Sequence, residues 1–297
     1  MEPLESPLIG WNPFARVDHF DRERVRERDA SLTLARMAAV IAAAVSSGAR
    51  GFTFTAGIHA NSLLHYLDHS GFQGRLAMYP LLPDTEAIPK LLSLGTRGMV
   101  TEMLRDLSGV GKMRAIFKGG WAAATSNPIG ALDTYVKVEI EKLARTAPRS
   151  CYVRSVLLHE TITDCIVGLQ AAEPMLAFHR IVSSMRGLSP GFQTRNLPAT
   201  LEFVRQIGID LRDVVIMTPA NPIGFQMAPT KLACERSLRE NTGLHAIAIS
   251  VLGAGQVEPR EALAYLNTLK GVESVAAGVS SPRHAADTFS TLSELHS

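Results

Sequence analysis

Residues 245–279 read HAIAISVLGAGQVEPREALAYLNTLKGVESVAAGV and contain a complete strand–helix–strand unit. The runs His245–Leu252 and Glu273–Val279 have the length of strands and are apolar with little alternation, as expected for strands covered on both faces. Between them, Glu258-Pro259 marks a helix start, because a proline at the first helical position loses no hydrogen bond. This stretch therefore predicts two parallel strands joined by a helix.

The same unit recurs along the chain from Gly51 onward. The predicted strands cover Gly51–Ala56, Arg75–Leu82, Lys112–Lys118, Tyr152–His159, Gly191–Arg195, Asp213–Pro219, His245–Leu252 and Glu273–Val279. Strands and helices in strict alternation predict an α/β fold, a (β/α)8 TIM barrel. The rival architecture, an open doubly wound sheet, lacks a GxGxxG sequence between a first strand and helix.

No linker divides the barrel, so we predict a single domain over residues 51–297. Residues 1–50 then form an N-terminal helical extension packed on the barrel. A helix over about residues 31–46 closes the bottom of the barrel or leads into its first strand. The segment Leu8–Phe14 is an extra strand or a loop over the active face.

The composition favours a soluble enzyme acting on small molecules. The chain has 297 residues with 30 Lys and Arg against 28 Asp and Glu, and this balance argues against nucleic acid as a partner. The apolar run Met37–Val45 is too short to cross a bilayer, so no membrane association is expected. Three cysteines without CxxC spacing favour a cytoplasmic protein with reduced thiols. The sequence does not decide the oligomeric state, and a homo-oligomer is one of the alternatives.

Barrel enzymes place their chemistry at the carboxyl ends of the strands, and this rule selects the catalytic candidates. Lys118 ends an apolar strand, where a charged side chain is costly to bury unless it serves a purpose such as forming a Schiff base or polarising a carbonyl. His159 and Glu160 follow the run SVLL, and an imidazole is well matched to proton transfer near neutral pH. Tyr79 is a further candidate proton donor. A structural role is the competing interpretation for each.

Other residues after the predicted strands are candidates for binding a substrate. They are His59, Arg195, Asn196 and Asn221. Two loops favour a phosphate or another oxyanion, because glycine amides and a helix amino end attract negative charge. These loops supply Gly253, Gly255, Ser280 and Ser281, although the same residues also suit ordinary turns and caps.

A metal site is not expected. His59, Asp84, His159, Glu160 and Asp164 could together supply ligands, but they show no HExxH or other fixed ligand spacing.

The carboxyl third, and especially the run HAIAISVLGAGQVEPREALAYLNTLKGVESVAAGVSSPRH, resembles the aldo/keto reductases. AIFKGG around Lys118 and SVLLH around His159 resemble the strands that carry the lysine and histidine of that family's Asp-Tyr-Lys-His tetrad. The resemblance implies that Gly253, Gly255, Ser280 and Ser281 face the phosphate end of a nicotinamide cofactor. The family's aspartate and tyrosine are not matched, since GFTFTAGIH offers Phe54 and His59 instead.

Three functions follow as hypotheses. The first is a carbonyl enzyme of aldolase, lyase or isomerase type, requiring no cofactor and acting on a small substrate that can carry a phosphate, in which Lys118 holds the carbonyl and His159 moves a proton. The second is an NADP-dependent reductase resembling the aldo/keto reductases, with Tyr79 or His59 as the acid. The third is a non-catalytic barrel that binds a partner.

Overall fold

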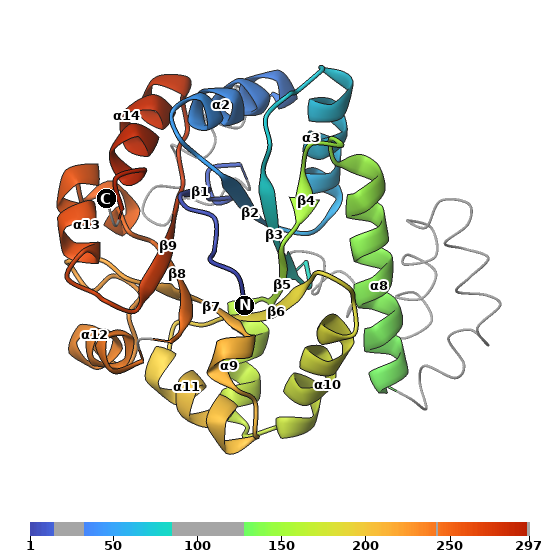
Figure 1. Ribbon diagram of the computed structural model, residues 1–297, viewed down its shortest axis with the longest axis vertical. Coiled ribbons are helices and arrows are strands. Elements are labelled where there is room, and N and C mark those ends of the chain that lie inside the picture. Colours follow the sequence, from blue (N-terminus) through green and yellow to red (C-terminus); the bar gives the residue numbers. More distant parts are fainter. Residues whose placement is uncertain (15–32, 85–127, 242, 296–297) are drawn as a thin grey trace.

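The computed structural model describes residues 1–14, 33–84, 128–241 and 243–295, which form a ring of parallel strands surrounded by helices (Figure 1). The strands are β1 (Leu8–Ile9), β2 (Gly51–Thr55), β3 (Ala77–Leu82), β4 (Tyr152–Val153), β5 (Ser155–Leu158), β6 (Ser189–Gln193), β7 (Val215–Pro219), β8 (His245–Ile249) and β9 (Val272–Ala277). The helices are α2 (Leu34–Ser46), α3 (Ile58–His69), α8 (Pro128–Thr146), α9 (Glu160–Gly168), α10 (Ala172–Ser183), α11 (Leu197–Gln206), α12 (Lys231–Glu240), α13 (Pro259–Leu266) and α14 (Pro282–Leu292).

The ring is closed. The nine strands follow the order β2-β1-β9-β8-β7-β6-β5-β3-β4, and β2 also pairs with β3. β4 and β5 both pair with β3 and share one position, which leaves the eight positions of a (β/α)8 barrel. The predicted fold class is therefore confirmed.

The first barrel position differs from the sequence prediction. β1 lies between β2 and β9, so the segment left open as a strand or a loop supplies a barrel strand from within residues 1–50. In the described ring β3 pairs directly with β4 and β5, and the predicted strand Lys112–Lys118, including the candidate Lys118 itself, lies outside the described residues.

Helix α2 joins β1 to β2 and packs between α14 and α3 in the outer ring. Of the two places predicted for this helix, the structure has the second: α2 leads into β2, the first strand predicted from the sequence, and does not close the bottom of the barrel. Residues before β1 lie at that end instead, and Figure 1 shows the N-terminal segment running into the centre of the ring. No helix within the described ranges has the length and apolar character needed to cross a membrane.

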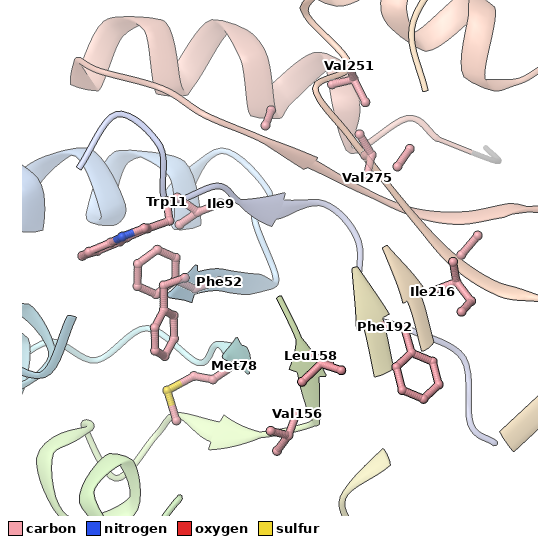
Figure 2. Close-up of a cluster of buried hydrophobic side chains, with 14 of the residues drawn as sticks. Ile9, Trp11, Phe52, Met78, Val156, Leu158, Phe192, Ile216, Val251 and Val275 are labelled. Carbon is pink, nitrogen blue, oxygen red and sulfur yellow. The ribbon is translucent and has the colours of Figure 1, made fainter. Parts of the chain in front are cut away.

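Side chains alternate between the inside of the barrel and the layer under the helices. Figure 2 shows the outer cluster, which includes Phe52, Met78, Leu158, Phe192 and Ile216. A second cluster fills the interior and includes Leu8, Tyr79, Leu157, Met217 and Ile247. This parity decides which polar residues at the strand ends face the interior.

Candidate active site at the carboxyl rim

The carboxyl ends of the strands and the amino ends of most helices share one rim of the barrel, as in other (β/α)8 proteins. Of the sequence-predicted residues, the structure brings His159, Glu160 and Arg195 together at one corner of this rim. They come from the ends of the adjacent strands β5 and β6. Two more residues that carry chemistry, Gln193 and Asp164, lie at the same corner.

His159 caps helix α9. Its Nδ1 atom accepts a hydrogen bond from the backbone N–H of Thr161 at 3.2 Å. An N–H group can only donate, so Nδ1 carries no proton in this arrangement and the neutral ring is protonated at Nε2. Burial lowers the pKa of His159 below its ordinary value, more than the nearby charge of Glu160 raises it. The side chain is therefore a neutral imidazole with an Nε2–H donor.

The protonation of His159 gives a testable pH dependence. Following the ring resonances of His159 by NMR, identified by their loss in His159→Asn, should give a midpoint below 6.5, the ordinary value. The unfolded chain then binds the proton more readily than the folded chain does. The contribution to stability is present above that ordinary value and is lost as pH falls toward the folded pKa. A midpoint at or above the ordinary value would contradict this assignment.

Glu160 and Arg195 form an ion pair across the corner. The Glu160 side chain is 14% exposed and that of Arg195 45%, so the carboxylate lies inside and the guanidinium outside. The backbone N–H of Arg195 also donates to Asp164 Oδ2 at 3.2 Å, which fixes the β6 loop against α9.

Asp164 anchors this corner, a role that the sequence did not reveal. Its Oδ1 atom accepts from the Thr194 hydroxyl at 2.5 Å, and Thr194 in turn contacts the buried Thr200 hydroxyl at 2.8 Å. Burial raises the pKa of Asp164 above its ordinary value, although both hydrogen bonds oppose that shift. Asp164 therefore positions the loop after β6, and we assign it no direct part in the chemistry.

Replacing this anchor should loosen the corner. We expect Asp164→Ala to lower the free energy of unfolding by about 1 to 2 kcal/mol, because the buried Thr194 hydroxyl and the Arg195 amide lose an acceptor. Asp164→Asn keeps one acceptor oxygen and should lose less. Urea unfolding of the three proteins measures both values, and equal stability of Asp164→Ala and the native chain would show that the contacts carry no net energy.

Tyr79 does not reach the rim. Its side chain points into the barrel interior, but the hydroxyl donates to the carboxylate of Glu5, which precedes β1 at the amino end. Burial, followed by this contact, raises the pKa of Tyr79. The predicted role of Tyr79 as an acid at the mouth therefore has no geometric support.

Three of the predicted binding residues have other surroundings. Asn196 caps α11, accepting from Ala199 N–H at 3.3 Å. Asn221 is buried, and its side-chain amide makes two hydrogen bonds to the backbone of Phe225, at 2.7 and 2.9 Å, that shape the loop after β7. His59 is exposed on the first turn of α3. Short polar residues after a strand serve caps and turns as readily as ligands.

The loops after β7 and β8 have an unusual backbone. Gln226, Ser250 and Ala254 adopt positive φ angles of 61°, 53° and 58°, and the Ser250 hydroxyl donates to the Gln226 side-chain oxygen at 3.0 Å. Non-glycine residues in this conformation are strained and often lie at functional sites. The strain places these two loops among the candidates for ligand contact.

The predicted anion loops differ from each other. In the β8 loop, Gly253 and Gly255 both have positive φ, but their amides donate to Ser250 and Leu252 within the loop. The amino end of α14 is more open. The Ser281 hydroxyl caps the helix by accepting from His284 N–H, and Ser280 and the exposed Arg283 lie beside it. An anion is therefore better served by the start of α14 than by the glycine loop.

Asp84 lies next to the same corner. Its carboxylate rests against Gly57, where any Cβ atom would overlap it, and its charge acts on His159. Despite these neighbouring carboxylates, no group of three or more His, Cys, Asp or Glu residues within the described ranges could hold a metal ion.

Comparison with known proteins places the fold. No family model matches the chain, and no curated protein matches it. Two solved structures of Pseudomonas aeruginosa proteins assigned as aldo-keto reductases are similar in fold. One is 13% identical, with 99% of this chain and 92% of that chain covered and a TM-score of 0.57. The other is 12% identical, with coverage of 99% and 91% and a TM-score of 0.57.

A third solved structure is of a protein assigned as a 2,5-diketo-D-gluconic acid reductase B. It is 12% identical, with coverage of 97% and 82% and a TM-score of 0.53. At such low identity the likeness concerns architecture alone. The chain has the (β/α)8 barrel that these reductases share.

Proposed function

We propose that the protein is an oxidoreductase that reduces a small carbonyl compound with a nicotinamide cofactor at the carboxyl rim. This proposal depends on the state of His159, which directly follows β5. Its imidazole is neutral, and its Nε2–H can donate a hydrogen bond to a substrate. A fixed, neutral donor at the edge of an apolar interior is suited to polarising a carbonyl oxygen.

At the rim, the amino end of α14 is suited to bind the anionic phosphates of such a cofactor. Arg283, exposed on the first turn of α14, has no acidic partner within the described ranges, and Ser280 adds a hydroxyl beside it. A helix amino end with a cation is a favourable site for phosphate. The β8 loop is less suited, because the Gly253 amide donates to Ser250 within the loop and the Ile223 side chain lies where a Cβ atom of Gly253 would be. Arg283, Ser280 and the amino end of α14 would hold the phosphates of the cofactor.

The bound cofactor would supply a hydride, an electron pair with its proton, to the carbonyl carbon. His159 Nε2–H holds the carbonyl oxygen and stabilises the negative charge that develops on it. The imidazole is neutral, so it acts as a hydrogen-bond donor rather than as the acid. The oxygen takes its proton from water at the open rim, and the product is an alcohol.

The aldolase, lyase or isomerase hypothesis required Lys118 and His159 at one rim, and Lys118 lies outside the described residues. The solved structures of similar fold are named as reductases, which favours the reductase over that hypothesis. The cytoplasmic location is a prediction from the sequence.

Titration with NADPH, followed by calorimetry, tests the proposal, together with the loss of reduced-cofactor absorbance when 4-nitrobenzaldehyde is added. We expect saturable binding and turnover. Arg283→Ala should weaken NADPH binding about 10-fold, the value of one charge-assisted hydrogen bond. Arg186→Ala, which removes an exposed arginine after α10, serves as the matched control. Absence of NADPH binding would exclude the reductase, and binding without turnover would favour a barrel that only binds.

A further inference from the structure

The strand register places Gln193 beside His159. In the parallel pair β5 and β6, Leu157 is level with Gly191 and Leu158 with Phe192, so the next level pairs His159 with Gln193. His159 continues the extended chain, since its N–H donates to Leu82 O at 2.7 Å. Leu157 belongs to the interior cluster, and alternation turns both His159 and Gln193 to the same side.

The orientation of the Gln193 side chain follows from its one hydrogen bond. Its Oε1 atom accepts from the backbone N–H of Glu160 at 3.4 Å. A backbone N–H group can only donate, so the oxygen must face Glu160 and the NH₂ group must point elsewhere. Within the described part of the chain, this NH₂ group has no hydrogen-bond partner. Gln193 is 8% exposed, so most of its side chain is covered by protein.

The other polar groups of the corner are already engaged. The Glu160 carboxylate pairs with Arg195, and Asp164 accepts from Thr194. Below the corner, the interior is lined by apolar side chains such as Leu157 and Met217. Two N–H donors on neighbouring strands therefore lie at the carboxyl end of an apolar interior.

We propose that Gln193 is a second donor to the carbonyl oxygen, acting with His159 as a two-donor site for the charge that develops during reduction. This inference rests on the carbonyl chemistry proposed above. Two fixed donors at the edge of an apolar interior stabilise a developing oxyanion without reorganising water. The site therefore favours substrates whose carbonyl is at the end of an apolar group.

Infrared difference spectra test this role without depending on turnover. The probe is 4-nitrobenzaldehyde labelled with ¹³C at the carbonyl and added to saturation in the absence of cofactor. Hydrogen bonds lower the carbonyl stretching frequency, so the native protein should give a red shift relative to water-free solvent. Gln193→Met should give a smaller shift, because one donor is lost. An unchanged shift in Gln193→Met, or no shift in the native protein, would overturn the proposal.

Gln193→Glu is a second variant that tests the same role if Gln193→Met does not fold. It is isosteric and keeps an oxygen facing Glu160 N–H, but it replaces the donor with an acceptor. Ser189→Ala is the control from the amino end of the same strand. With turnover as a second readout, both Gln193 variants should lower kcat about 100-fold with little change in KM, as expected for a group that acts on the transition state.

The two proposals can fail separately. If NADPH neither binds nor is oxidised while the red shift still depends on Gln193, the reductase proposal fails and the two-donor site stands. If turnover and the red shift are both unaffected by Gln193→Met, the reductase stands and the role of Gln193 is wrong.

Discussion

His159→Asn is expected to lower kcat/KM for carbonyl reduction by about 100-fold while leaving the stability of the fold nearly unchanged. The two ring nitrogens of His159 have separate roles, the cap that the structure shows at Nδ1 and the proposed contact with the substrate at Nε2. Nδ1 caps α9 by accepting from Thr161, and Nε2–H is available to the substrate. Asparagine is a preferred capping residue, so its side-chain oxygen can replace Nδ1. Its shorter side chain does not extend to the position of Nε2.

Two further variants separate capping from chemistry. His159→Ala removes both functions and should lower the free energy of unfolding by about 1 kcal/mol in addition to the loss of activity. Thr230→Ala removes the cap of α12, because the Thr230 hydroxyl accepts a hydrogen bond from Ala233 N–H at 3.2 Å. That control should reduce stability by about the same amount and leave turnover intact. Urea unfolding and steady-state kinetics measure the two effects, and full activity in His159→Asn would show that the histidine is only a cap.

Most of the barrel could be predicted because its strands are short apolar runs at regular intervals. β7, for example, reads VIMTP and is buried throughout, and the sequence marked it within two residues. β1 contains only Leu8 and Ile9, too few to produce a pattern. The apolar run at 112–118 is a stronger signal, and the sequence therefore predicts a barrel strand there. Closure of the ring is a property of pairing between distant strands, which single-sequence periodicity does not report.

The residues of the candidate site could be chosen from the sequence only in part, for a similar reason. A histidine directly after an apolar run made His159 a candidate, and Tyr79, another candidate, faces the barrel interior. Alternation does not say toward which end of the barrel a long side chain points, and Tyr79 points to the amino end because Glu5 accepts its hydroxyl there. The sequence did not single out Gln193, because one glutamine within a strand has no motif and the proposed role depends on the register with His159.

Glu5→Ala should have the largest effect on stability, a loss of about 3 kcal/mol in the free energy of unfolding. The Glu5 carboxylate closes the amino end of the barrel by accepting from the hydroxyls of Tyr79 and, at 2.6 Å, Tyr152. Arg154 Nε lies 3.8 Å from it and adds an ion pair. Tyr79 is 0% exposed, so without Glu5 its hydroxyl is a buried donor with no replacement from water, which costs about 1 to 3 kcal/mol. The remainder comes from Tyr152 and the unpaired arginine.

The controls for this prediction also test the role of Tyr79. Glu2→Ala removes an exposed side chain from the same segment and should change stability by less than about 0.5 kcal/mol. Tyr79→Phe removes only the hydroxyl and should lose about 1 kcal/mol, because Glu5 keeps its other partners. The double variant Glu5→Ala with Tyr79→Phe should be less destabilised than the sum of the two single variants, since both remove one shared contact. Urea unfolding gives these values. Turnover in Tyr79→Phe should equal that of the native chain, and a large loss of turnover there would return the tyrosine to the catalytic machinery.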